Sequence, residues 1–341
     1  MKILAIDTTG FTTSISIVDN GRRVILLKNK CCFIKNRLWR DFVVELPIRH
    51  KENLLKIVKS QKINFNELDF LALSSKSGIS NCLVIGEIFT YLLAQIYKKE
   101  VLGVDHILAH VYSCFLERDF QKIKYPILVF SASGSHSDIA LIKNVNECEI
   151  LTNEIKHINK DGVDVLVGIG KIFDHFSRRI GISTPFDFSV EKLDKICFLG
   201  DQNRYRFRKY YNGALTDMNF SGFLEKIMRF YEKNKKIKQK TFLNDVAASF
   251  QKTIIDIIVE KIIFLADKHS VAEIHLAGGV SCNGYLRTTI RRVLKDRIKT
   301  VCRFPKKKVY SLDNAAMVAC LAYYQKKYNI KFKNFKPAIT K

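Results

Sequence analysis

Apolar and polar positions alternate at the start of the chain in a way that predicts three strands. Lys2–Asp7 is a short apolar run that ends in an acid, and Ser14–Val18 alternates between polar and apolar residues. Residues 19–21 read Asp-Asn-Gly, the composition of a tight hairpin turn, so Arg22–Leu27 is expected to return as a third strand. The polar stretch Thr8–Thr13 forms the loop between the first two predicted strands.

The same order of elements occurs a second time. It comprises a strand, a loop of small polar residues, a strand, a turn and a strand, at Pro126–Phe130, Ser131–Ser137, Asp138–Ile142, Asn144–Asn146 and Cys148–Asn153. An internal repeat indicates a duplicated architecture. Two such loops that face each other can grip one phosphate chain with their backbone N–H groups. The pattern therefore predicts an α/β fold that resembles the actin-like and sugar-kinase-like (ASKHA) nucleotide-binding proteins.

Apolar residues at helical spacing predict the remaining elements. Helices are expected at Ile48–Gln61, Leu83–Tyr97, His106–Leu116, Gly162–Ile180, Phe242–Ala266, Tyr285–Leu294 and Asp313–Tyr324, and short strands at Phe70–Ser74, Val101–Val104 and Glu273–Leu276. The length of 341 residues fits two lobes of ordinary domain size. We expect residues 1–112 with about 300–330 in the first lobe, 113–299 in the second, and a basic tail at 331–341, with nucleotide and metal in the cleft between the lobes.

The charge of the chain adds to this picture, because it has 57 Lys and Arg but only 33 Asp and Glu, which gives a net charge of +24. A field this positive favours a polyanionic partner, nucleic acid first. Compositional drift toward Lys and Asn is the alternative for part of the excess. Three lysine-rich stretches are expected to be exposed: Lys233–Lys240, Lys306–Lys308 and Lys326–Lys336.

Nine cysteines are scattered without any C-x-x-C pair, which is typical of reduced cytosolic thiols and does not favour a zinc–cysteine site. No stretch approaches the ~18 consecutive apolar residues of a membrane span. The first residues lack the long apolar region of a secretory signal. We therefore expect a cytoplasmic protein without a membrane partner.

Metal binding is suggested by His106 and His110. Their spacing of four places both imidazoles on one helix face, where they can chelate one ion, although each histidine alone is more often structural. Asp313 follows a loop and opens a helix, so it is the candidate third ligand. Its alternative role is the N-cap of that helix, which contributes about 1 kcal/mol.

Anion binding is suggested by two loops. Ala277–Asn283 contains paired glycines between a strand and a helix, which allow close backbone approach to a ligand at a helix N-terminus. Ser133–Ser137 offers hydroxyl and N–H groups in the second copy of the repeat. In Arg204–Tyr211, basic and aromatic residues interleave, and this pattern fits base stacking on RNA and an amphipathic strand equally well.

Taken together, these motifs resemble the TsaD family of bacterial tRNA adenosine threonylcarbamoyltransferases, relatives of the KEOPS catalytic subunit, from Met1 to about Tyr324. The family's H-x-x-x-H pair matches His106 and His110, and its T-D-N-x-A-M segment matches Leu312–Met317 with Asp313 as ligand. The family's other segments match Ala277–Asn283, Ser133–His136 and Lys171–His175, where Asp174 would bind the ribose.

The resemblance implies transfer of a threonylcarbamoyl group from threonylcarbamoyl-adenylate to the N6 amine of adenosine 37 in tRNAs that read ANN codons, with release of AMP. It implies one divalent metal, iron(II) first and zinc as the alternative. It also implies tRNA, TsaB-like and TsaE-like partners. The residues expected to bind the substrate nucleotide are Ser133, Gly134, Ser135, His136, Asp174, Asp187, Gly278, Gly279 and Asn283.

The chain departs from the family at a loop near the nucleotide. Residues 183–187 read Ser-Thr-Pro-Phe-Asp where the family has paired glycines, so Phe186 and Asp187 are expected to weaken nucleotide binding. Two other functions remain as alternatives: a non-catalytic TsaB-like scaffold and an actin-like small-molecule kinase. The histidine pair argues against the scaffold, and the lack of an acid in the loop Thr8–Thr13 argues against the kinase.

Overall fold

The computed structural model describes residues 1–32, 39–134, 136–152, 157–158, 164–165, 168–183, 189–211, 213, 218, 220–235, 241–295, 297 and 300–335. The chain divides into two compact units. One holds Met1–Lys124, Lys143–Glu149 and Phe304–Lys341, and the other holds Tyr125–Ile142 and Ile150–Arg303. The first unit thus includes residues 113–124 and 143–149, which we had expected in the second lobe.

A five-stranded sheet of order β3-β2-β1-β4-β5 forms the first unit. Its antiparallel part is β1 (Lys2–Asp7), β2 (Thr12–Asp19) and β3 (Arg23–Cys31), while β4 (Phe70–Lys76) and β5 (Glu100–Asp105) continue it in parallel. The predicted turn is confirmed, since Asn20 and Gly21 both have positive φ, 50° and 66°. A Cβ on Gly21 would lie 2.3 Å from the ring of Tyr323, so packing also requires glycine.

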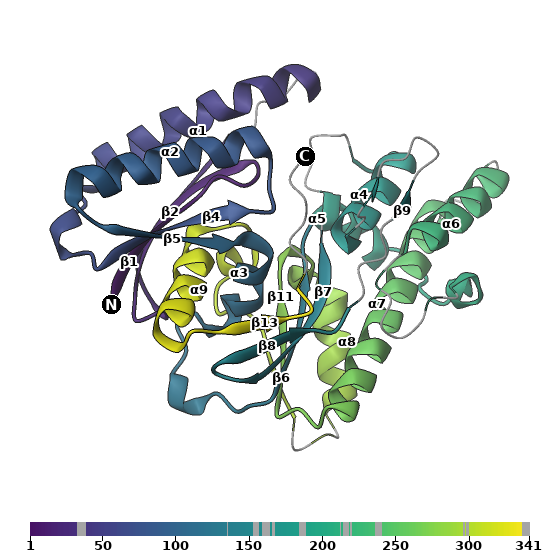
Figure 1. The fold of residues 1–341 in the computed structure, drawn as a ribbon. Helices are drawn as coiled ribbons and strands as arrows, with labels where there is room; N and C mark the ends of the chain where they lie inside the picture. The colour runs from purple at the N-terminus through teal and green to yellow at the C-terminus, as the bar shows by residue number, and fades with distance from the viewer. Residues whose placement is uncertain are drawn as a thin grey trace. The chain divides into compact units, whose positions relative to one another are not determined.

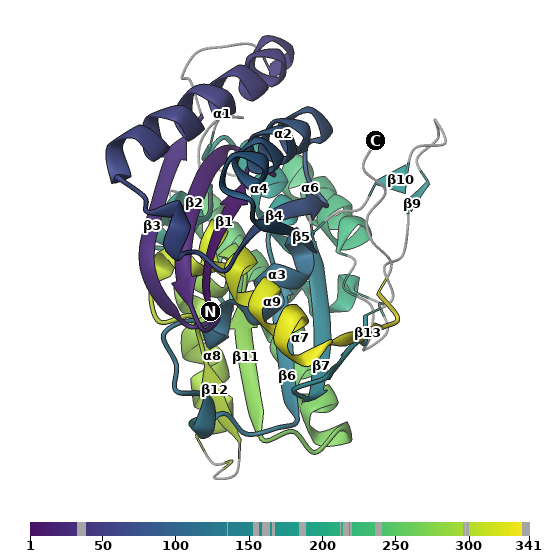
Figure 2. The same ribbon diagram turned by 60° about the vertical axis from the view of Figure 1, so that its left-hand side comes forward.

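Helices cover both faces of this sheet (Figures 1 and 2). On one face lie α1 (Trp39–Gln61) and α2 (Ser80–Tyr97), and on the other α3 (His106–Tyr112) and α9 (Ala315–Tyr328). All residues of α9 from Ala315 to Tyr324 are buried, because this apolar helix packs against β1, β2 and α3. The prediction that the final helix packs on the first part of the chain is confirmed.

The second unit is built on β6 (Ile127–Ala132), with β7 (Ser137–Asn144) antiparallel to it and β11 (Glu273–Ala277) parallel on its other side. The short strand β12 (Val301–Arg303) adds to β11 in parallel. The helices described in this unit are α4 (Ile169–Arg179), α5 (Ser189–Phe198), α6 (Ser221–Asn234), α7 (Phe242–Lys268) and α8 (Gly284–Leu294). An aromatic cluster joins α4, α6 and α7. The ring of Phe250 stacks on that of Phe176, with centroids 3.8 Å apart, and on that of Phe223, with centroids 5.9 Å apart.

Three predictions about local structure are wrong. The helix expected from Gly162 begins at Ile169, because Asp164–Val165 forms strand β10 against β9 (His157–Ile158). The basic tail, expected as a segment apart from both lobes, begins with strand β13 (Lys331–Lys333), which pairs in parallel with β8 (Glu147–Ile150).

The third correction concerns the basic and aromatic segment Arg204–Tyr211. It forms a 3-10 turn over Phe207–Tyr210 instead of a strand. Phe207 is 2% exposed, and Tyr205 stacks on it at 5.7 Å and meets the ring of Phe230 at 5.0 Å. These rings belong to the packed interior of the second unit, so Phe207 is not available to stack on a base.

Among the described residues, no helix is long and apolar enough to cross a bilayer.

Candidate metal centre and nucleotide loops

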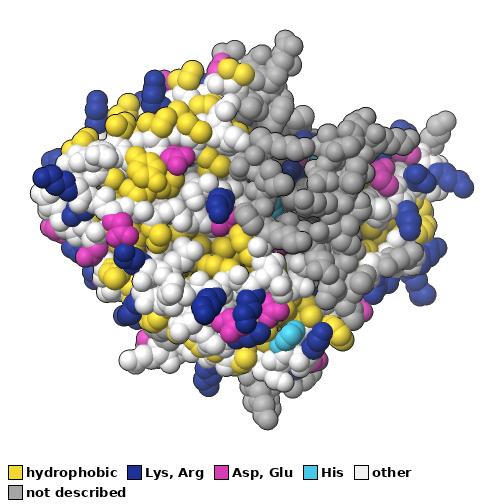
Figure 3. Space-filling view, in the orientation of Figure 1, with side chains coloured by type: hydrophobic (Ala, Val, Ile, Leu, Met, Phe, Trp, Pro, Cys, Tyr) yellow, Lys and Arg dark blue, Asp and Glu magenta, His cyan; other side chains and the backbone are white. Residues whose placement is uncertain are grey.

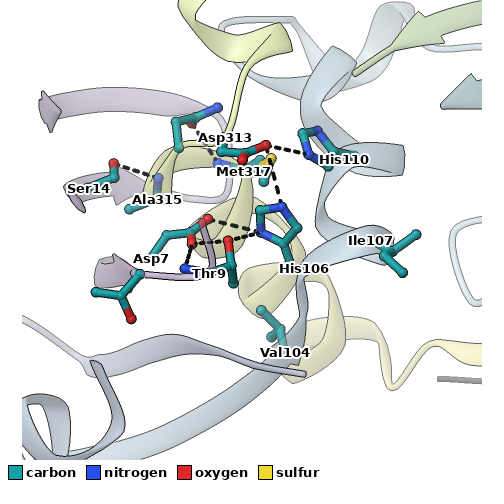
Figure 4. A network of polar contacts seen from close by, with 12 residues as sticks. Asp7, Thr9, Ser14, Val104, His106, Ile107, His110, Asp313, Ala315 and Met317 are labelled. Carbon is teal, nitrogen blue, oxygen red and sulfur yellow. Dashed lines mark hydrogen bonds and ion pairs between the residues drawn. The ribbon is translucent and has the colours of Figure 1, made fainter. Parts of the chain in front are cut away.

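Two histidines and one aspartate from distant parts of the first unit meet at one point (Figure 4). His106 and His110 lie on α3, and their Nε2 atoms are 3.5 Å and 3.1 Å from Oδ1 of Asp313. One ligand atom from each residue lies within 4.8 Å of the other two. The structure therefore brings together the three residues that the sequence suggested as metal ligands.

The start of α3 is fixed by the residue before it. The Asp105 carboxylate accepts hydrogen bonds from the backbone N–H groups of Ile107 at 2.8 Å and Leu108 at 3.2 Å, so the helix begins at His106. This cap places His106 in the first turn and His110 one turn later on the same face.

Asp313 is free to point at the histidines because it does not cap α9. That cap is Asn314, whose Oδ1 accepts from the N–H of Met317 at 3.2 Å and whose Nδ2 donates to the carbonyl of Leu312 at 2.7 Å. The N–H of Ala315 donates to the Ser14 hydroxyl at 2.8 Å, which attaches the helix start to β2. The alternative reading of Asp313 as an N-cap is therefore wrong.

A second layer of side chains, which the sequence interpretation missed, supports His106. Its Nδ1 lies 3.1 Å from Oδ2 of Asp7 and 3.1 Å from the Thr9 hydroxyl. The strand β1 delivers Asp7 to this point, and Asp7 is only 1% exposed. The signal in the sequence was an apolar strand that ends in a buried acid.

The charges of the site favour a cation. Burial alone would lower the pKa of His106, but the charge of Asp7 and the hydrogen bond to Asp313 raise that pKa well above 6.5. Burial alone would raise the pKa of Asp313, but hydrogen bonds from both histidines hold it well below its usual value. Burial lowers the pKa of His110. The pKa values of the Asp7 and Asp313 carboxyls are both lowered, so two carboxylates lie beside the two imidazoles and favour a bound cation.

The donor set fits a metal ion. Two imidazole nitrogens and one carboxylate oxygen suit zinc or iron(II), and this set does not distinguish them. The Asp313 side chain is 42% exposed while those of His106 and His110 are 9% and 2% exposed. The cluster is therefore closed on the histidine side and open on the aspartate side, as a site that also binds a substrate requires.

The second unit gathers two of the predicted nucleotide loops at one edge of its sheet. Ser133 and Gly134 follow β6, and Gly278 follows β11, which runs parallel to β6 beside it. The carbonyls of Ser133 and Gly134 accept from the first N–H groups of α4, those of Gly170 at 3.2 Å and Lys171 at 3.0 Å. Ligands of open α/β sheets bind at this carboxyl edge of parallel strands.

The remaining predicted nucleotide residues have other contacts. Asp174 forms an ion pair with Arg178 at 2.5 Å, one turn along α4. Asn283 is 1% exposed and caps α8, accepting from the N–H of Leu286 at 2.8 Å and donating to Asp194 at 2.6 Å. His136 closes the turn after β6, where its carbonyl accepts from the N–H of Ser133 at 2.9 Å.

Glycine is required at position 278 by packing. Gly278 has φ +74°, and a Cβ there would lie 2.2 Å from the carbonyl oxygen of Ala132. Gly279 begins a 3-10 turn directly after it. Ser135 and Asp187 lie outside the described residues, so their roles stay predictions, as does the contact of the other loop residues with a nucleotide.

Comparison with known sequences shows what the chain is similar to. A family model described as TsaD, tRNA N6-adenosine threonylcarbamoyltransferase, matches residues 48–320. The protein of that name from Endomicrobium trichonymphae is 30% identical, with 98% of this chain and 95% of that protein covered. The one from Mycoplasma capricolum is 31% identical, with 95% of this chain and 97% of that protein covered.

Solved structures share the fold at low sequence identity. HypF from T. kodakarensis matches with a TM-score of 0.66 and 14% identity over 96% of this chain, which spans about half (48%) of the HypF chain. Component A of the (R)-2-hydroxyglutaryl-CoA dehydratase of Acidaminococcus fermentans matches with a TM-score of 0.50 and 13% identity, over 95% of this chain and 98% of that one. These likenesses confirm the predicted actin-like and sugar-kinase-like α/β fold.

Proposed function

The chain belongs to the TsaD family of tRNA N6-adenosine threonylcarbamoyltransferases, which are acyltransferases, and we propose that it transfers a threonylcarbamoyl group from threonylcarbamoyl-adenylate to the N6 amine of adenosine 37 in tRNAs that read ANN codons. AMP is the leaving group. The observation that carries the proposal is the meeting of His106, His110 and Asp313. A non-catalytic scaffold has no need of this cluster, so the enzyme is favoured over the scaffold.

The proposed transfer reaction depends on the positioning of its two substrates more than on proton transfer. The adenylate is a mixed anhydride, so its phosphate leaves readily, while the exocyclic amine of adenosine is a weak nucleophile. A divalent metal held here would supply Lewis-acid stabilisation of developing negative charge, worth several kcal/mol. His106, His110 and Asp313 would hold that ion, with iron(II) as our first choice and zinc as the alternative. The exposed side of Asp313 leaves room for the donor.

The nucleotide of the donor would be held by the second unit. We assign its phosphate to the loops Ser133–His136 and Gly278–Gly279, where the N–H of Ser133 is already bonded to the His136 carbonyl and helps to shape the turn. We assign its ribose to Asp174. For Asp174 to accept from a ribose hydroxyl, it must share or release its ion pair with Arg178, one turn along the helix. Asn283 would act through the shape of its loop, because its side chain is already paired within the protein.

The tRNA partner is supported by charge. Lys306, Lys307 and Lys308 are all exposed, and they lie in the segment that leads to Asp313. Lys233 and Lys235 are exposed at the end of α6, while Lys236–Lys240 lies outside the described residues. Lysines that neutralise phosphates release condensed counterions and make binding strongly dependent on salt. A net charge of +24 is suited to this mode of binding.

A protein partner is supported by the outer side of α2 (Figure 3). Val84, Ile88, Leu92 and Ile96 are spaced four residues apart and are 48%, 53%, 57% and 68% exposed. A stripe of this kind on the surface is typical of an interaction site. We assign it to a TsaB-like partner, with a TsaE-like protein as a further member of the complex. Replacing Ile88 by Glu should abolish the complex and leave metal binding unchanged.

The experiment that tests the function is reconstitution with tRNA, a purified donor-synthesising enzyme and the protein partners. Wild-type protein should form threonylcarbamoyladenosine, detected by mass spectrometry of digested tRNA. His110→Ala should lose metal and product while keeping its circular dichroism spectrum. Absence of product with wild-type protein, or full activity of the variant, would contradict the proposal. Depletion in cells should lower the same modified nucleoside.

A further inference from the structure

The two histidines of the metal cluster differ in what lies behind them (Figure 4). His106 Nδ1 has two oxygen neighbours at 3.1 Å, Oδ2 of Asp7 and Oγ1 of Thr9. His110 Nδ1 is buried and has no hydrogen-bond partner within the part of the chain that the structure describes. The two rings meet edge to face, with centroids 4.9 Å apart, and α3 is buried along its whole length. The same ligand type therefore occurs in two different environments.

The hydrogen bonds define which nitrogen of His106 carries a proton. The Thr9 hydroxyl donates its only hydrogen to Oδ1 of Asp7 at 2.7 Å, and the N–H of Thr9 donates to the same oxygen at 2.9 Å. The hydroxyl and Oδ2 of Asp7 can therefore only accept at His106, so Nδ1 of His106 must be the donor. The coordinating lone pair of His106 is then on Nε2, which faces Asp313.

We propose that Asp7, held by Thr9, is a positioning residue that makes His106 the primary ligand of the metal centre and leaves His110 as the weaker, more readily exchanged one. A carboxylate behind a ligating histidine fixes its tautomer and ring orientation and raises its basicity. Among the residues that the structure describes, none gives His110 such support, so its buried Nδ1 must keep a proton without an acceptor from them, which costs free energy. The inference rests on the metal site of the proposed function, and it ranks His106 above His110 in its contribution to metal affinity.

The substitution Asp7→Asn tests this order because of how an amide must sit there. The amide oxygen has to take the place of Oδ1, where two donors from Thr9 point. The amide nitrogen then faces His106 Nδ1 and donates to it. That reverses the tautomer and puts the proton on Nε2, the atom that should bind the ion.

The measurement is cobalt(II) and zinc affinity by competition with a chelator, which needs no activity. Asp7→Asn should lower affinity by about 10–100-fold, the usual effect of losing such a partner. Thr9→Val should lower it less, since it frees the carboxylate without removing it. His106→Gln should cost more than His110→Gln. Asp119→Asn, an exposed carboxylate of the same unit, is the matched control and should bind like wild type.

Two further measurements distinguish a loss of the positioning role from a loss of the fold. The ¹⁵N imidazole spectrum of the metal-free protein should show His106 protonated at Nδ1 in wild type and not in Asp7→Asn, and circular dichroism should show both folded. Affinity of Asp7→Asn within twofold of wild type, or a larger loss from His110→Gln than from His106→Gln, would overturn the positioning role alone. Wild-type protein that binds neither ion would overturn the metal site of the proposed function and this inference with it.

Discussion

Replacing Asn314 by Ala should both destabilise the first unit and disturb the metal site. The Asn314 side chain is fully buried and makes three hydrogen bonds. It caps α9 through the N–H of Met317 and donates to the carbonyls of Val309 at 3.2 Å and Leu312 at 2.7 Å. Loss of the cap costs about 1 kcal/mol. Each of the two hydrogen bonds lost to a backbone carbonyl costs about 0.5–1.5 kcal/mol.

The expected loss is therefore about 2–4 kcal/mol in the free energy of unfolding, measured by urea denaturation. Asn314→Ser is the matched control, because serine keeps a cap acceptor and lacks the two amide donors, so it should lose about half as much. Metal affinity should fall in Asn314→Ala, since the turn that aims Asp313 loses its internal bonds. An unfolding free energy within about 0.5 kcal/mol of wild type would refute this reasoning.

Three more expectations follow from other parts of the molecule. Burial lowers the pKa of His50 below 6.5, so as the pH falls the unfolded chain protonates this imidazole more readily than the folded protein does. The free energy of unfolding should therefore decrease as the pH falls below about 6.5. His50→Gln should flatten this decrease, and an unchanged pH profile would contradict the argument. Gly278→Ala should lower the free energy of unfolding by about 1–3 kcal/mol, because of its positive φ and the nearby Ala132 carbonyl. Gly222→Ala, in the first turn of α6 where a Cβ meets nothing within 4 Å, should be neutral or slightly stabilising. Equal stability of the two variants would refute the packing argument. Changing Lys306–Lys308 to Gln should lower the salt slope of tRNA binding by about 0.7–0.9 per lost phosphate contact, and a slope equal to that of wild type would exclude this segment from the interface.

Much of the sheet architecture followed from local pattern, because strands and turns depend on neighbours in sequence. The hairpin at Asn20-Gly21 is the clearest case, since both residues tolerate positive φ and lie between alternating strands. The helix expected from Gly162 failed for a reason that is also local. Residues 163–167 read Val-Asp-Val-Leu-Val, an alternation that fits β10 better than a helix start.

The support of the metal site could not be predicted because it depends on contacts between distant residues. Asp7 and His106 are 99 residues apart, and nothing near either one indicates the other. Asp313 and Asn314 are both good capping residues, so their sequence leaves the choice open until Ser14 and the turn carbonyls are in place. The burial of Phe207 could not be predicted for a similar reason, because Phe207 packs on Phe230 of α6 and its neighbour Tyr205 packs on Phe242 of α7.

The way α9 closes the first unit has a consequence for how the protein is made. Its first N–H bonds to a hydroxyl 301 residues earlier, and Asp313 meets a histidine 203 residues earlier. On the ribosome, the opening sheet must therefore wait with one apolar face uncovered while the whole second unit is synthesised, and this is a period in which chaperones would be needed. A nonsense mutation between His110 and Asp313 would yield a nascent chain with both histidines and no third ligand. Quality control that detects the exposed face would remove such a product before it could compete for tRNA.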